Sequence, residues 1–204
     1  MTKHMVDIFE ILFGSKARVR LLRLLLLNSE KEFSVEEVME KTLLKKSEVT
    51  RELNHLKKIK LVTERSKKNK KVLVLNVQFP FYIELKSLFS KSDIDAQSKA
   101  FQKLNSVGEV KLVIVSGVFL NYAKSKADMI LVVNNVNRAK LKSAMSYLEA
   151  EIGRDIRFVL MNNEELQYRL NMMDRFLMEF LEHSHQEIIN KAPELKRFMS
   201  GLKR

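Results

Sequence analysis

One segment, from Ser47 to Ile59, constrains the fold of this chain more than any other. At 100° per residue its apolar residues Val49, Leu53 and Leu56 form one stripe, with Ile59 at the edge. A helix of about a dozen residues, capped by Ser47, would bury this stripe and expose the opposite face. The exposed face would carry Ser47, Arg51, Asn54, His55 and Lys58, flanked by Thr50 and Lys57. Side chains of these types read base edges or hold phosphates.

Helix signals also precede this segment. Ser34 and Glu37 have the spacing of a capping box, and Phe33 with Val38 has the spacing of a hydrophobic staple. Ser15 follows Gly14 and is a natural cap for a Leu-rich helix. The helices expected before residue 47 span residues 6–13, 16–27 and 35–41, with a turn over 42–46.

Two short apolar runs follow the segment, separated by a basic run. Leu61-Val62-Thr63 opens one strand, and Val72-Leu73-Val74-Leu75 forms another. The sequence between them, Arg65-Ser66-Lys67-Lys68-Asn69-Lys70-Lys71, predicts a hairpin with a basic tip. Helix, helix, turn, helix and basic hairpin is the order of a winged helix-turn-helix.

The charge distribution favours a polyanionic partner. The net charge is +12, and residues 1–90 hold 19 Lys and Arg against 11 Asp and Glu, compared with 18 against 14 in residues 91–204. Nucleic acid is the commonest partner of such a basic half, although a solvated basic surface is the alternative interpretation. The chain has no cysteine, which excludes disulfides, thiolate metal sites and cysteine nucleophiles.

The stretch Leu12-Phe13-Gly14-Ser15-Lys16-Ala17-Arg18 and the region from Ser47 to Leu61-Val62 resemble winged helix-turn-helix regulators of the ArsR-like type. The resemblance implies a homodimer on double-stranded DNA, with half-sites about one helical turn apart. Lys60 departs from the glycine that the family commonly has before the wing strand. Metal-sensing members use cysteine or histidine clusters, so we expect no metal site here. The expected DNA-binding residues are Lys45, Lys46, Ser47, Thr50, Arg51, Asn54, His55, Lys58, Lys67, Lys68, Lys70 and Lys71.

Pro80 interrupts the pattern, and we expect a first domain over residues 1–90 and a linker helix over 91–108. Residues 81–89 predict a helix that closes this domain and offers a surface to a second copy. The motif Ser92-Asp93-Ile94-Asp95 looks like paired metal-binding aspartates, but no apolar strand flanks it. We therefore interpret it as the capped start of a helix.

Residues 109–204 predict a small α/β domain. The expected strands span 110–115, 128–133 and 156–161, and the expected helices span 137–153, 164–172 and 174–183, with a last one from about Pro193. This order resembles the minimal nucleotidyltransferase fold. His183 and His185 are interpreted as exposed side chains rather than metal ligands.

The nucleotidyltransferase family needs several carboxylates to hold Mg²⁺, which prefers oxygen ligands. In its pattern, a Gly-Ser turn is followed by two strand aspartates one residue apart and by a third carboxylate on a later strand. Here the turn reads Ser116-Gly117, Lys126 occupies the first aspartate position, and only Asp128 remains. The resemblance therefore implies a degenerate nucleotide site at these residues, without catalytic residues. Lys126 could pair with Asp128 across one face of the strand, as a structural ion pair of small value.

The sequence predicts an α+β chain with an N-terminal winged helix-turn-helix and a C-terminal nucleotidyltransferase-like domain. We expect a DNA-binding transcriptional regulator, in particular a dimeric repressor. Its C-terminal domain would be a non-catalytic sensing or dimerisation module with no cofactor, and a small-molecule or nucleotide effector is compatible with it. The alternatives are a nucleotide-binding or nucleotidyl-transferring enzyme or antitoxin component, and an RNA-binding adaptor. No signal peptide and no apolar run of about 20 residues is found, which favours a cytoplasmic protein without membrane contact.

Overall fold

The computed structural model describes residues 8–67, 69–91, 99–193, 195 and 197–198. It is a mixed α+β protein with two small sheets, as expected for the fold class. The chain forms two compact units: unit 1 is Met1–Ser92 with Ser146–Asp155, and unit 2 is Asp93–Met145 with Ile156–Arg204. Lys68 and the predicted helix start at Ser92-Asp93 lie outside the described residues. No helix in the described part is long and apolar enough to cross a bilayer.

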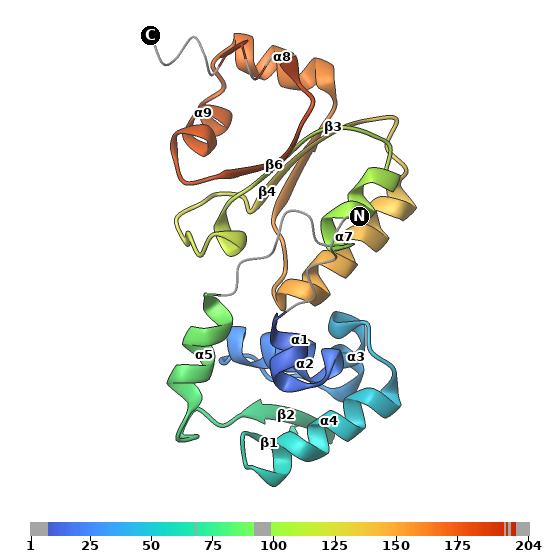
Figure 1. The fold of residues 1–204 in the computed structure, drawn as a ribbon, viewed down its shortest axis with the longest axis vertical. Coiled ribbons are helices and arrows are strands. Elements are labelled where there is room, and N and C mark those ends of the chain that lie inside the picture. Colours follow the sequence, from blue (N-terminus) through green and yellow to red (C-terminus); the bar gives the residue numbers. More distant parts are fainter. Residues whose placement is uncertain (1–7, 68, 92–98, 194, 196, 199–204) are drawn as a thin grey trace. The chain divides into compact units, whose positions relative to one another are not determined.

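The N-terminal helices of unit 1 pack around α2 (Figure 1). Ser15 caps α2, because its Oγ accepts the backbone N–H of Arg18 at 3.2 Å. Leu21, Leu25 and Leu26 of α2 are almost fully buried, as expected of a central Leu-rich helix. The predicted helices are thus confirmed over the described residues, as α1 (Ile8–Phe13), α2 (Lys16–Leu27) and α3 (Val35–Thr42).

The turn into the next helix corrects one prediction. The capping box of Ser34 and Glu37 is present, and α3 ends at Thr42, followed by the C-cap residue Leu43 in a left-handed conformation with φ 54°. Helix α4 (Lys46–Lys58) is not capped by Ser47. Its N-cap residue is Lys45, whose backbone N–H donates to the Glu48 carboxylate at 2.9 Å. Because Glu48 lies three residues after Lys45, it can reach back to this amide, and Ser47 falls inside the first turn.

The predicted basic hairpin is present as β1 (Val62–Lys67) and β2 (Lys70–Leu75). The strands are antiparallel, with Val62 opposite Leu75 and Lys67 opposite Lys70. Lys60 has a φ of 59°, the left-handed conformation that explains why a glycine is favoured before such a strand. Helix α5 (Tyr82–Ser90) follows and packs against α2, which confirms the predicted helix over 81–89.

A second segment, Ser146–Asp155, completes unit 1. It contains the C-terminal turns of α7 (Arg138–Ile152). The Glu151 carboxylate pairs with Arg20 and, at 3.0 Å, with Lys16, while its backbone carbonyl accepts from Arg23 Nη1 at 2.8 Å. Gly153 has a φ of 70°, and a Cβ there would lie 2.6 Å from the backbone of Arg23. This close packing onto α2 was not predicted from the sequence.

Unit 2 is built on a four-stranded sheet with the order β5-β4-β3-β6. Strand β3 is antiparallel to β4 and β6, and β4 is parallel to β5. Helices α8 (Asn163–Asn171) and α9 (Arg175–Glu182) pack on one sheet face, sharing a core with Leu112, Ile114 and Ile130. The predicted strands are confirmed as β3 (Glu109–Val115), β4 (Met129–Asn134) and β5 (Phe158–Met161), whereas β6 (Gln186–Asn190) was missed.

Shorter helices complete the description of unit 2. Helix α6 (Lys99–Gln102) and the 3₁₀ turn Lys103–Ser106 lie within the expected linker helix, whose residues 92–98 are outside the description. A 3₁₀ turn, Gly117–Phe119, follows β3. Of the last predicted helix, from about Pro193, residues 194, 196 and 199–204 are not described.

Candidate nucleic-acid interface

The polar face predicted for α4 is exposed on unit 1. Val49, Leu53 and Leu56 are at most 4% exposed, so the apolar stripe faces the core as expected. Ile59, which was placed at the edge of the stripe, is 53% exposed. The structure exposes every polar residue predicted for this face and its N-terminal end: Lys45, Lys46, Ser47, Thr50, Arg51, Asn54, His55 and Lys58.

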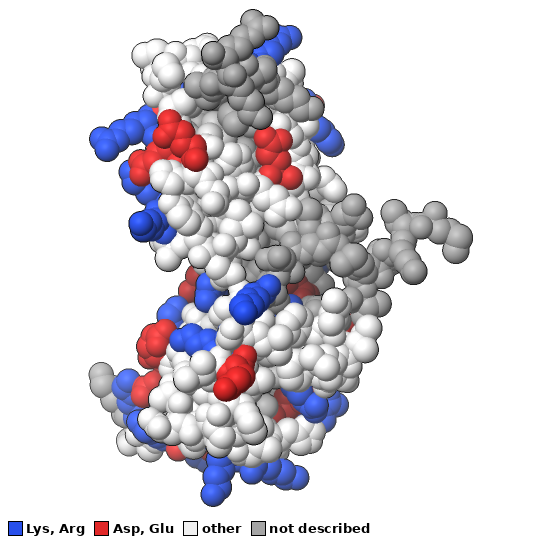
Figure 2. All heavy atoms as spheres, turned by 60° about the vertical axis from the view of Figure 1, so that its left-hand side comes forward, with Lys and Arg blue, Asp and Glu red and all other residues white. Residues whose placement is uncertain are grey.

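The β1–β2 hairpin adds further cations to unit 1. Lys67, Lys70 and Lys71 are exposed, and Lys67 forms an ion pair with Glu32. Lys70 and Lys71 form no ion pair within the part of the chain that the structure describes. Lysine and arginine side chains project from the lower end of unit 1 in Figure 2, where Figure 1 places α4 and the hairpin.

An ion pair connects these two basic elements. Lys57 of α4 pairs with Glu64 of β1, and both side chains are half-buried. The hydrogen bond from Lys57 is the largest influence on Glu64, and it lowers the pKa of that carboxyl. The pair therefore holds the hairpin against α4 at neutral pH, when both groups are charged.

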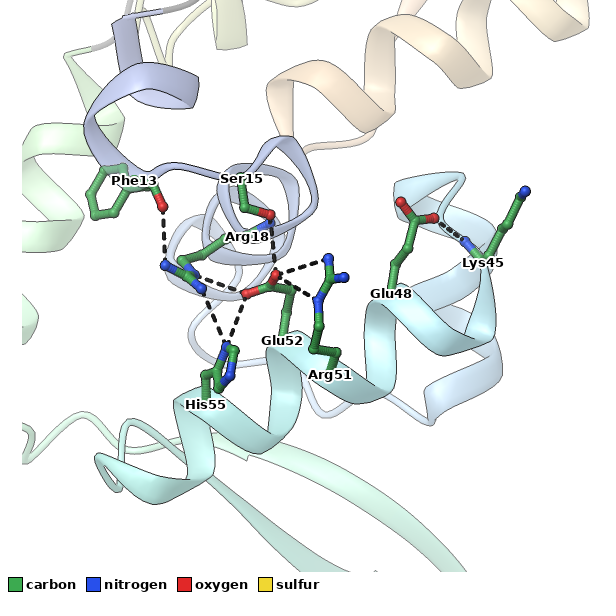
Figure 3. Close-up of polar contacts among 8 residues, drawn as sticks. All are labelled: Phe13, Ser15, Arg18, Lys45, Glu48, Arg51, Glu52 and His55. Carbon is green, nitrogen blue, oxygen red and sulfur yellow. Dashed lines mark hydrogen bonds and ion pairs between the residues drawn. The ribbon is translucent and has the colours of Figure 1, made fainter.

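Glu52, which was not among the residues predicted for the interface, is buried beneath the exposed face of α4 (Figure 3). Its Oε2 accepts from Arg18 Nε at 2.8 Å, and its Oε1 accepts from Ser15 Oγ at 3.1 Å. Arg51 Nε lies 3.4 Å from the same Oε1, and His55 Nδ1 lies 3.5 Å from Oε2. The carboxylate thus connects the start of α2 to two residues of the exposed face.

These contacts keep the Glu52 carboxyl ionised. Burial by itself raises its pKa, but the hydrogen bond and charge of Arg18 outweigh burial, with help from Ser15 and His55, and the pKa is lowered. A buried carboxylate without partners would be costly. One signal was available in the sequence, because helical periodicity places Glu52 between Val49 and Leu56 on the apolar stripe.

The second candidate site, in unit 2, centres on Asp128, which is fully buried immediately before β4. Its Oδ1 accepts the Val118 backbone N–H at 3.0 Å. Its Oδ2 accepts the Arg157 backbone N–H at 2.8 Å and the Arg157 Nε at 3.0 Å. Burial raises the pKa of Asp128, but these hydrogen bonds outweigh it and the pKa is lowered. Gly117 has a φ of 50°, and a Cβ there would lie 1.9 Å from Asp128 Oδ1.

The predicted ion pair between Lys126 and Asp128 is wrong. Lys126 Nζ pairs with Glu179 of α9 at 2.6 Å. The cation that lies beside Asp128 is Arg157 instead of Lys126. The prediction assumed that both residues lie on one strand, where alternate side chains share a face, but β4 begins only at Met129. Ser116 Oγ is also engaged, because it donates to the Ser184 carbonyl at 2.7 Å.

This arrangement limits the chemistry of the second site. The Asp128 carboxylate accepts hydrogen bonds on both oxygens, so a metal would have to displace Arg157. Asp155, the carboxylate that lies three residues before β5, pairs with Lys41 at 2.6 Å within unit 1. Among the described residues, no group of three or more histidine and carboxylate side chains is arranged to hold a metal ion.

Comparisons with models of known protein families, with curated proteins and with solved structures find no match. Function must therefore be inferred from the chemistry of the described surfaces. Of the two candidate sites, the exposed face of α4 has free donors for a ligand, whereas the carboxylate of Asp128 already has its partners.

Proposed function

We propose that unit 1 is a winged helix-turn-helix of the ArsR-like type and that this chain is a transcriptional regulator that binds double-stranded DNA. Helices α3 and α4 form the helix-turn-helix, and the β1–β2 hairpin is the wing. The observation that carries the proposal is the exposed polar face of α4, which holds Arg51 and Asn54 opposite the buried stripe of Val49, Leu53 and Leu56. A helix that presents such side chains can enter the major groove and contact base edges.

The wing supports this assignment through its charge. Lys70 and Lys71 are exposed on a hairpin that the Lys57–Glu64 pair holds against α4. When α4 lies in the major groove, such a hairpin can follow the phosphates beside it. Phosphate contacts position a protein on DNA but do not read sequence, so we assign readout to α4 and general affinity to the wing.

The regulator is proposed to act as a homodimer. Helices α1 and α5 adjoin, because the rings of Phe9 and Phe13 lie 5.0 and 5.5 Å from that of Phe89. Both helices leave large apolar side chains at the surface, and exposed apolar patches of this kind commonly mark interfaces. The exposed residues are Ile8, Ile11 and Leu12 of α1 and Ile83 and Leu88 of α5.

Unit 2 is proposed to be a nucleotidyltransferase-like module without catalysis. Nucleotidyl transfer needs carboxylates that are free to hold Mg²⁺, and Arg157 occupies the Asp128 carboxylate. The alternative, a nucleotide-transferring enzyme or antitoxin component, requires Arg157 to leave. Incubation with labelled nucleoside triphosphates, Mg²⁺ or Mn²⁺ and candidate acceptors tests this, because transfer that disappears in Asp128→Ala contradicts the proposal.

DNA binding is tested by selecting sites from a random duplex pool with the full chain. We expect enrichment of a defined site, and the Arg51→Ala and Asn54→Ala variants should each bind it about 1–3 kcal/mol more weakly. Gel shifts with wild type and variants measure this. If the pool shows no enrichment, α4 does not read DNA. The same conclusion follows if a folded variant that combines Arg51→Ala with Asn54→Ala binds the site like wild type. A parallel selection from RNA distinguishes the RNA-binding alternative.

A further inference from the structure

Two groups exposed on α4 are held from beneath by buried charge. Arg51 and His55 lie four residues apart on one helix face and are therefore neighbours in space. Arg51 contacts the carboxylate of Glu52, and His55 contacts both Glu52 and Arg18 (Figure 3). Arg18 is itself fixed, because its Nη1 donates to the Phe13 carbonyl at 3.0 Å.

The contact with Glu52 determines which edge of the Arg51 guanidinium stays free. Nε and Nη2 lie 3.4 and 3.3 Å from Glu52 Oε1, so the side edge of the guanidinium faces the carboxylate. A guanidinium has five N–H donors in a fixed plane. Both hydrogens of Nη1 and one of Nη2 remain, and they form an end edge with two parallel donors. The Arg51 side chain is 60% exposed, which leaves this edge accessible.

The His55 ring is held in the same way. Its Nδ1 lies 3.3 Å from Arg18 Nη2 and 3.5 Å from Glu52 Oε2, so both contacts from beneath α4 involve the same ring nitrogen. The His55 side chain is 48% exposed, and Nε2 is therefore the ring nitrogen that can contact a ligand beside the Arg51 edge.

We propose that Glu52 and Arg18 are positioning residues that hold Arg51 and His55 to recognise guanine in the major groove. In that groove guanine presents two adjacent acceptors, N7 and O6, whereas adenine pairs its N7 acceptor with an N6 donor. Among the four bases, two parallel donors on Arg51 match guanine alone, and His55 Nε2 is placed to contact the neighbouring base. This inference rests on the proposed function, because it requires α4 to lie in the major groove.

The test uses the full chain and its selected site, with each guanine replaced in turn by 7-deazaguanine, which lacks the N7 acceptor. Wild type should lose roughly 5- to 150-fold in affinity at the guanine that Arg51 contacts. Arg51→Lys keeps the positive charge but lacks the two parallel N–H donors. This variant should therefore bind the sites with guanine and with 7-deazaguanine nearly equally. Because Arg51 is exposed, this variant does not threaten the fold.

Glu52→Gln tests the positioning role itself. The change removes a negative charge, which by charge alone strengthens binding to any DNA. Glu40→Gln is the matched control, because Glu40 is exposed on α3 and loses the same charge without touching this face. We expect Glu40→Gln to keep the full preference for guanine over 7-deazaguanine. Glu52→Gln should lose most of that preference, and Glu52→Asp should recover part of it.

The outcomes separate this inference from the proposed function. Absence of any DNA binding by wild type overturns both. Selective binding that is indifferent to 7-deazaguanine at every guanine overturns the guanine assignment alone. A Glu52→Gln variant that folds and retains the full preference overturns the positioning role, and if that variant does not fold, the behaviour of Arg51→Lys decides the guanine assignment.

Discussion

Two buried carboxylates, Glu52 and Asp128, show how this protein places charge in its interior. Each is at most 1% exposed, and each accepts hydrogen bonds on both oxygens, from arginine and from other donors. In both cases burial raises the pKa of the carboxyl, but the hydrogen bonds from arginine outweigh the effect of burial, and the pKa is lowered. The consequences differ, because Glu52 holds two side chains of the exposed α4 face, whereas Asp128 joins the turn after β3 to the segment before β5.

The Asp128→Asn variant tests the structural role of that carboxylate. The amide would place an NH₂ group against donors of Arg157 or Val118, so we expect a loss of about 2–4 kcal/mol in the free energy of unfolding at pH 7. The folded pKa lies below the ordinary 3.8, so the stabilisation is present above that pH and is lost as the pH falls through the folded pKa. Urea unfolding at several pH values between 7 and 3 measures both effects.

Asp155→Asn is the control for this prediction, because Asp155 pairs with Lys41 but is 60% exposed. Exposed pairs contribute about 0–1 kcal/mol, so this variant should unfold almost like wild type. A difference between wild type and Asp128→Asn that stays constant down to pH 3 would show that ionisation of Asp128 is not its source.

At the scale of elements, local signals predicted most of the fold. The Gly14-Ser15 boundary defines the start of α2, and the capping box of Ser34 with Glu37 defines that of α3. Strand β6 lacks such a signal, because Gln186 and Glu187 are polar and exposed and only pairing with β3 makes the segment a strand. That pairing is non-local, so periodicity could not reveal it.

The candidate interface could likewise be predicted only in part from the sequence. Periodicity predicted which α4 residues face outward, since a helix face depends only on spacing. The partners beneath that face could not be predicted, because Arg18 lies 34 positions before Glu52 and meets it only when α2 and α4 pack. For the same reason the sequence did not indicate that Lys126 would pair with Glu179, which lies 53 positions away.

For the β1–β2 hairpin, the prediction concerns how DNA affinity depends on salt concentration. Replacing Lys70 and Lys71 by glutamine should weaken binding to all DNA sequences similarly, and it should flatten the slope of log K against log[salt] by about 0.9 per lysine. Lys67→Gln is the matched control, and we expect a smaller change because Glu32 already pairs with Lys67. Fluorescence anisotropy from low to high salt measures the slopes. A loss confined to particular DNA sequences would mean that the hairpin reads bases.

At the scale of the whole molecule, the proposed dimer predicts a change in mass. Ile11→Glu combined with Ile83→Glu places charge on the exposed apolar residues of α1 and α5, and should convert a dimer into a monomer. Loss of the second half-site should weaken operator binding by roughly 100-fold or more. Light scattering after gel filtration measures the mass. Met172→Glu is the control, because Met172 of unit 2 is also exposed, and a monomeric wild type would contradict the proposal.

Unit 1 is formed by two separate segments of the chain, and the second segment supplies partners to buried arginines of the first. Arg20 and Arg23 of α2 are each 5% exposed, and Glu151 supplies a carboxylate to Arg20 and a carbonyl to Arg23. The Arg20 guanidinium also lies 5.0 Å from the ring of Tyr147. Burial raises the pKa of Glu151, but the hydrogen bond from Arg20 and the charges of Arg20 and Lys16 outweigh burial, and the pKa is lowered. These contacts come from a segment that lies more than fifty residues beyond α5 in the sequence.

A fragment that ends at residue 92 therefore lacks part of its own fold. It removes the Glu151 carboxylate from Arg20 and the Glu151 carbonyl from Arg23, and breaking a buried pair by removing one partner costs about 3–5 kcal/mol. We expect this fragment to unfold in urea well before unit 1 of the full chain, and a fusion of residues 1–92 to 146–155 through a flexible linker should recover much of the loss. In the full chain Glu151→Ala should reproduce the part of the destabilisation that comes from Arg20, while Glu40→Ala, on the exposed surface of α3, should not destabilise the protein. A fragment of residues 1–92 as stable as the fusion would show that Ser146–Asp155 is dispensable for unit 1.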